Sequence, residues 1–133
     1  MASTVEWYIP DRVILNVVSG VYTLDQICEG SQQILSMMRT GASPVHLIVD
    51  SSELTNFPSI FRPLLVEIEK FRHEPTMGWS FMLTHSPVLN FFGALASNIT
   101  KQPFRSVKSY AEVNNILCRI DQSLVKLMPN LDP

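Results

Sequence analysis

The chain has little of what several functional classes require. Its two cysteines, Cys28 and Cys118, lie far apart and belong to no Cys/His cluster, so we expect free thiols and no metal site. Ten basic residues stand against 12 acidic ones, which excludes the basic face that nucleic acid requires. No apolar run reaches the roughly 18 residues of a membrane span, and the first residues lack a signal-peptide pattern. We therefore expect a soluble, cytoplasmic protein without a cofactor.

The composition that remains is that of one globular domain. Hydrophobic residues make up 46% of the 133 residues and charged residues 17%, a balance that excludes a disordered chain. A chain of this length buries a sizeable core when it folds. Because no repeat, low-complexity tract or linker divides the sequence, we expect a single domain over residues 1–133.

Strand-like and helix-like patterns alternate along the chain. The first two strands flank the turn signal Pro10-Asp11 and predict a hairpin that Gly20 closes. The segments with strand patterns are residues 5–9, 13–18, 45–49, 79–83 and 104–108. The predicted helix starts are Thr23, a position between Ser59 and Pro63, Ser86 and Ser109. The polar residues 51–58 predict a loop, and the last helix is expected to run to Leu127.

The resulting order, ββαβαβαβα, predicts an α/β fold. We expect a mixed, mainly parallel five-stranded sheet with four helices, because strands that alternate with helices pair in parallel. The first strand is expected to be antiparallel and to lie at an edge. Glu67 is expected on the outer face of the second helix, and His46, within an apolar strand, is expected to be a hydrogen-bonded structural residue.

Residues 75–100 contain no Asp, Glu, Lys or Arg, although they include a predicted helix from residue 87. A surface helix normally carries charged residues on its outer face. Either this helix is covered by the sheet and the final helix, or its outer face lies against a second subunit, a partner or a lipid. We expect a homodimer or partner interface centred on Phe91, Phe92 and Leu95.

Polar residues gather where the predicted strands end, at the edge where open α/β sheets bind ligands. Thr84, His85 and Ser86 are candidates for an anion or ligand site, because helix N-termini present free N–H groups there. Ser51 or Ser52 with His85 and a carboxylate would also supply the parts of a serine hydrolase. The chain has no Gly-x-Ser-x-Gly elbow and only five glycines, so we expect no enzyme.

The segment His46-Leu47-Ile48-Val49-Asp50-Ser51-Ser52-Glu53-Leu54-Thr55, with the predicted element order, resembles the STAS/SpoIIAA-like family. Further segments are similar to bacterial SpoIIAA-like proteins over nearly the whole chain. They are Trp7-Tyr8, Arg12-Val13-Ile14, Gly20 with Thr23-Leu24, Pro44-Val45, Gly78-Trp79 and Phe92 with Ala96-Ser97. The resemblance implies a small domain that binds partners without catalysis, and in anti-sigma-factor antagonists a serine at the start of the second helix is a phosphorylation switch.

The family's switch motif, Asp-Ser-Ser-Gly, is not reproduced here. Asp50-Ser51-Ser52-Glu53 lacks the glycine and follows a strand, whereas Ser59 matches the position of the switch but follows no aspartate. Asp50, Ser51, Ser52 and Ser59 are therefore the candidates for an interaction or phospho-switch site.

By resemblance we expect a non-enzymatic regulatory or protein-interaction module in bacterial signalling. The alternative is a small binding domain for a lipid or other apolar ligand, which needs a cavity near the charge-free helix.

Overall fold

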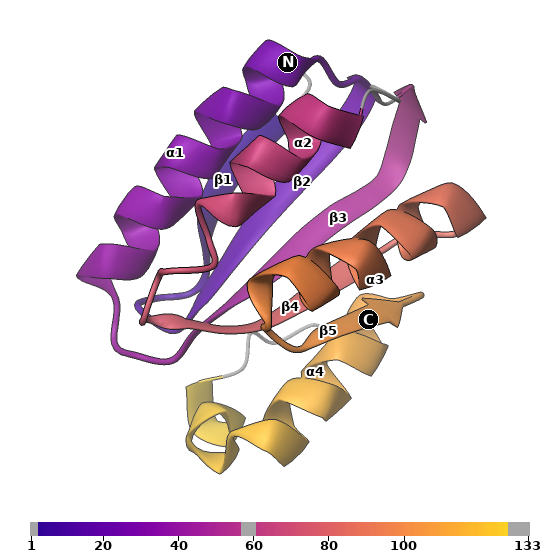
Figure 1. The fold of residues 1–133 in the computed structure, drawn as a ribbon. Helices are drawn as coiled ribbons and strands as arrows, with labels where there is room; N and C mark the ends of the chain where they lie inside the picture. The colour runs from indigo at the N-terminus through magenta and orange to yellow at the C-terminus, as the bar shows by residue number, and fades with distance from the viewer. Residues whose placement is uncertain (1–2, 57–60, 128–133) are drawn as a thin grey trace.

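The computed structural model describes residues 3–56 and 61–127, and its elements follow the predicted order (Figure 1). The strands are β1 Ser3–Ile9, β2 Val13–Val21, β3 Val45–Asn56, β4 Met77–Leu83 and β5 Phe104–Val107. The helices are α1 Leu24–Thr40, α2 Phe61–Glu69, α3 Pro87–Thr100 and α4 Tyr110–Ile120, and a 3-10 helix, η1, spans Gln122–Leu127. The predicted α/β architecture is confirmed.

The five strands form one sheet in the order β1-β2-β3-β4-β5. β1 pairs antiparallel with β2 at one edge, as predicted, and all the other neighbours are parallel. Helices α1, α2 and α3 cover one face of the sheet, whereas α4 and η1 cover the other (Figure 1). Two apolar cores result. Phe81, Ile48 and Leu117 lie in the core on the α4 side, and Ile14, Met38 and Phe71 lie in the core on the other side.

Three of the predicted helix starts carry the N-terminal caps that the sequence indicates. Thr23 and Gln26 form a capping box, in which the Thr23 hydroxyl accepts from the Gln26 N–H and the Gln26 side chain accepts from the Thr23 N–H. Ser86 caps α3 ahead of Pro87, and Ser109 caps α4. These caps satisfy backbone N–H groups that have no partner inside a helix.

Three predicted boundaries are wrong. Residues 51–56 do not form a loop, because they extend β3 alongside the end of β2, with Glu53 opposite Ser19 and Asn56 opposite Val21. Gly20 does not end β2, since it adopts a positive φ of 64° at an irregularity in the pairing and the strand continues to Val21. The predicted last helix is also interrupted, because α4 ends at Ile120 and the chain continues as η1.

Candidate functional site

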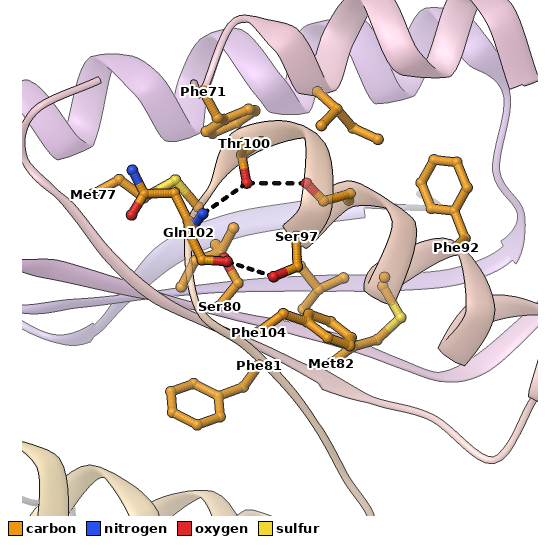
Figure 2. Close-up of a pocket in the computed structure, with 15 residues that line it drawn as sticks. Phe71, Met77, Ser80, Phe81, Met82, Phe92, Ser97, Thr100, Gln102 and Phe104 are labelled. Carbon is orange, nitrogen blue, oxygen red and sulfur yellow. Dashed lines mark hydrogen bonds between the residues drawn. The ribbon is translucent and has the colours of Figure 1, made fainter. Parts of the chain in front are cut away.

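A cavity of about 170 Å³ lies between α2, α3 and the sheet (Figure 2). Its wall is almost entirely apolar, with Met77 and Met82 from β4, Phe92 from α3, and Phe104 from β5. Methionine side chains are flexible and adapt to ligands of irregular shape. The cavity lies directly beneath the charge-free helix, where the apolar-ligand alternative requires one.

A second cavity of about 160 Å³ lies next to the first, beneath α1 and α2. The two cavities share six wall residues, which are Leu47, Val49, Ile68, Phe71, Met82 and Phe92. The second cavity also has polar residues in its wall, namely Asn16, Tyr22, Ser31 and Glu67. Both cavities therefore have mainly apolar walls with a few polar residues, and Glu67, in the second, is the charged residue among the described residues of the two walls.

Small residues of α3 make room for the first cavity. Gly93, Ala96 and Ser97 form part of its wall, where larger side chains would fill it. A Cβ atom on Gly93 would lie only 2.1 Å from Cζ of Phe104, so glycine allows the Phe104 ring to lie directly against the helix backbone. The absence of charge on this face of α3 follows from its contact with the cavity.

The outer face of α3 is not covered by the rest of the described chain. Phe91 and Val88 are each 64% exposed, whereas Leu95 is half-buried. Phe92 is only 8% exposed and lines both cavities, so it points away from the surface that Phe91 occupies. The three residues predicted as one interface thus divide between the interior and the surface.

The polar residues 50–52, within β3, form hydrogen bonds with one another and with neighbouring elements. Asp50 accepts from the Ser52 N–H at 3.1 Å, from the Ser52 hydroxyl at 2.7 Å and from the Tyr110 hydroxyl. Burial and the adjacent Asp50 carboxylate raise the pKa of Tyr110. Ser51 is buried and donates to the Leu83 carbonyl at 2.9 Å. Ser59 lies outside the described residues.

The serine-hydrolase arrangement is not formed by these residues. Ser51 and Ser52 donate to the Leu83 carbonyl and to Asp50, and neither hydroxyl is bonded to His85. Thr84 accepts from the Ser86 N–H at 3.0 Å, while Ser86 caps α3. Thr84 and Ser86 therefore shape the start of the helix, and His85 is exposed beside them.

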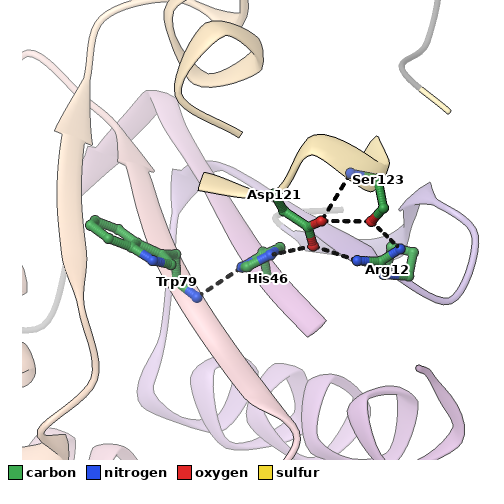
Figure 3. Close-up of polar contacts among 5 residues, drawn as sticks. All are labelled: Arg12, His46, Trp79, Asp121 and Ser123. Atoms are coloured by element: carbon green, nitrogen blue, oxygen red, sulfur yellow. Dashed lines mark hydrogen bonds and ion pairs between the residues drawn. The ribbon is translucent and has the colours of Figure 1, made fainter. Parts of the chain in front are cut away.

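A second polar cluster lies at the opposite edge of the sheet, where η1 contacts the starts of the strands (Figure 3). Arg12 forms an ion pair with Asp121 and donates to the Ser123 hydroxyl at 3.0 Å. Buried His46 accepts the Trp79 N–H on Nδ1 at 2.9 Å, which confirms its predicted structural role. Nε2 of His46 has no hydrogen-bond partner in the described part of the chain and lies 3.8 Å from Asp121.

Because of this cluster, we expect the protein to lose stability as the pH falls below about 6.5. Burial lowers the pKa of His46, and Arg12 lowers it further against the opposing effect of Asp121. Between the ordinary histidine pKa and this lowered pKa, the unfolded chain binds a proton that the folded protein does not. The free energy of unfolding should then fall by at most about 1.4 kcal/mol per pH unit.

Urea denaturation at a series of pH values between 5 and 7.5 measures this dependence. The variant His46→Asn keeps an acceptor for the Trp79 N–H but does not titrate, so its stability should change less over the same range. An equally steep dependence in the variant would show that another group is responsible.

The comparisons with known proteins locate this architecture among solved structures. No family profile and no curated protein matches the sequence. The structure is similar to an uncharacterised protein of the DUF3478 family with a SpoIIAA-like fold from Shewanella loihica PV-4. The two share 15% sequence identity with a TM-score of 0.64, over 88% of this chain and 93% of that one. This chain has a SpoIIAA-like fold. The resemblance predicted from the sequence is confirmed at the level of fold.

Within residues 3–56 and 61–127, no helix has the length and apolar character needed to cross a membrane. The same residues contain no group of three or more His, Cys, Asp or Glu side chains arranged to hold a metal ion.

Sequence reasoning found part of this site. The charge-free segment pointed to α3, and Phe92 was among the residues named there. Glu67 was predicted on the outer face of α2, and this is wrong because it is 7% exposed and lines the second cavity. A signal was present, since Glu67 lies three residues after Leu64 and four before Phe71, both of which are buried.

Proposed function

We propose that this SpoIIAA-like domain is a non-enzymatic binding module that holds a small apolar ligand between its helices and its sheet. The observation that carries the proposal is the pair of adjoining cavities with apolar walls beneath α1, α2 and α3. Ligand sites are typically concave and mainly apolar, with a few polar groups. The cavities have this composition, and they account for the lack of charge on the inner face of α3.

The volume of the cavities sets the size of the ligand. An apolar cavity of about 150 Å³ engineered in another protein stays free of water and binds benzene. Each of the two cavities, at about 170 and 160 Å³, therefore has room for a group the size of one aromatic ring. A ligand that occupied both would be a short chain or a two-ring molecule.

The polar residues of the sheet edge support a role without catalysis. Catalysis by a serine nucleophile needs a hydroxyl that is hydrogen-bonded to a base. Ser51 is buried and donates to a backbone carbonyl, and Ser52 donates to Asp50, which also binds Tyr110. These contacts stabilise the end of the sheet and support binding as the function.

A variant that fills the cavity tests the proposal. Ala96 lines the first cavity, so Ala96→Phe should place a ring in the space that a ligand would occupy. We expect the affinity for toluene, measured by shifts of amide signals in NMR titration, to fall at least tenfold. The larger side chain is expected to lower the free energy of unfolding by at most about 3 kcal/mol, and urea denaturation checks that the variant is folded.

Ala94→Phe is the matched control, because Ala94 lies on the same helix but is exposed and is not part of the cavity wall. This variant should bind toluene as the unmodified protein does. Equal affinity in all three proteins, or no binding to the unmodified protein, would contradict the proposal.

The second candidate is a regulatory or protein-interaction module that docks through the outer face of α3. The exposed side chains of Val88 and Phe91, on a helix without charged residues, favour it. Exposed apolar patches mark interaction sites. Because Ala96→Phe leaves this surface unchanged, partner binding that survives in that variant separates the second candidate from the first.

A further inference from the structure

The wall of the second cavity includes polar side chains from α1, α2, β2 and the residue that follows β2. Glu67 from α2 is 7% exposed, and Asn16, Tyr22 and Ser31 join it in the wall. Neighbouring Glu69, by contrast, has a side chain that is 45% exposed. A carboxylate in a mainly apolar wall costs free energy unless it is paired, so its position calls for a partner.

Lys70 supplies one partner for this carboxylate from the outside of the protein. Its Nζ lies 2.8 Å from Oε2 of Glu67 and 3.0 Å from Oε1, and the lysine side chain is 42% exposed. Lys70 is not part of either cavity wall. Glu67 is the sole charged side chain among the described residues that line the two cavities. A bound molecule therefore finds no cation among the described wall residues, and the carboxylate that it meets is already paired with Lys70.

Two hydroxyl groups lie in the same wall. The Tyr22 hydroxyl lies close to α1, so that a Cβ atom on Gly30 would be 3.1 Å from it. Within residues 3–56 and 61–127, neither the Tyr22 hydroxyl nor the Ser31 hydroxyl has a hydrogen-bond partner. Together with Glu67, they offer acceptors to a ligand that can donate.

We propose that the ligand of these cavities is an apolar molecule with a hydrogen-bond-donating head, such as a hydroxyl group, and that Glu67 selects it against carboxylates of the same size. This inference rests on the proposed function. A hydroxyl group can donate to the Glu67 carboxylate and accept from Tyr22 or Ser31. A ligand carboxylate would lose its hydration without finding a cation to pair with, because Lys70 lies outside the described wall residues and is already paired with Glu67.

The test compares 1-octanol with octanoate, which have the same chain and differ in the head group. Both are titrated against the full chain at pH 7 and followed by NMR. We expect octanol to bind more tightly than octanoate. In Glu67→Gln the ratio of the two affinities should fall by roughly tenfold, because one hydrogen bond to a charged group changes an affinity by about that factor. In the unmodified protein this ratio also reflects the difference in polarity between the two probes. The change in the ratio between the unmodified protein and Glu67→Gln is therefore the result that tests the proposal.

Glu69→Gln is the matched control, because Glu69 lies on the same helix and forms the same kind of i,i+3 ion pair, with Arg72, at the surface. It should leave the ratio unchanged. Tyr22→Phe gives an independent measurement if Glu67→Gln does not fold. It should weaken octanol several-fold and leave toluene, which has no polar head, unaffected.

The outcomes separate this inference from the proposed function. If neither toluene nor octanol binds, the proposed function fails and this inference fails with it. If toluene binds but Glu67→Gln behaves as Glu69→Gln does, or Tyr22→Phe leaves octanol binding unchanged, the cavity function stands and the assignment of the head group is overturned.

Discussion

Replacing Phe81 with alanine is expected to lower the free energy of unfolding by about 3–5 kcal/mol. Phe81 lies in the middle of β4, is fully buried and belongs to the core that the sheet forms with α4. Its ring also stacks against Trp79, with centroids 6.1 Å apart. Removing the ring loses buried apolar area and leaves a space that the surrounding strands cannot fill by relaxing. Urea denaturation at constant pH measures the loss.

Phe91→Ala is the matched control, because it deletes the same side chain at a position that is 64% exposed. The free energy of unfolding should change by at most about 0.5 kcal/mol. A loss as large as that of Phe81→Ala would mean that the outer face of α3 is covered, and would support the interface of the second candidate function.

Replacing Gly78 with alanine should lower the free energy of unfolding by about 2–4 kcal/mol, which is large for one added methyl group. A Cβ atom at this position would lie 2.5 Å from Nδ1 of His46 and 3.1 Å from Cβ of Pro44. His46 is 2% exposed and cannot move away without losing the hydrogen bond from the Trp79 N–H. The cost therefore combines overpacking with a broken buried hydrogen bond.

A double-mutant cycle identifies the cause of this loss. His46→Ala removes the ring that the new methyl group would meet, so adding Gly78→Ala in that background should cost much less. Thermal or urea denaturation of the four proteins gives the coupling between the two positions. Strictly additive effects would show that the alanine disturbs the strand in another way.

The turn and the helix starts were predictable from the sequence because short-range contacts decide them. Pro10-Asp11 forms the hairpin turn, in which Asp11 has a φ of 66°. Thr23 is bonded to Gln26, three residues away, as the capping-box pattern requires. Patterns of this kind involve only neighbours along the chain, and the flanking apolar periodicity then predicts which segments form strands and helices.

The length of β3 was not predictable in the same way. Residues 51–56 are polar, with Ser52, Glu53, Thr55 and Asn56 exposed, and by composition they are typical of a loop. They form a strand because β2 continues beside them to Val21 and pairs with their backbone. The paired residues of β2 lie 34 or 35 positions earlier in the chain, so the local sequence carries no sign of them.

The amino-acid sequence determined by itself the order of the elements, the caps, the edge position of β1 and the lack of charge on α3. Each of these depends on a residue and its near neighbours in the chain. Tertiary structure alone decided that α3 covers a cavity, that Phe92 points inward while Phe91 does not, and that Glu67 lies in the cavity wall. These features arise where three helices from separate parts of the chain meet one face of a sheet, and the space left between them depends on all four surfaces together.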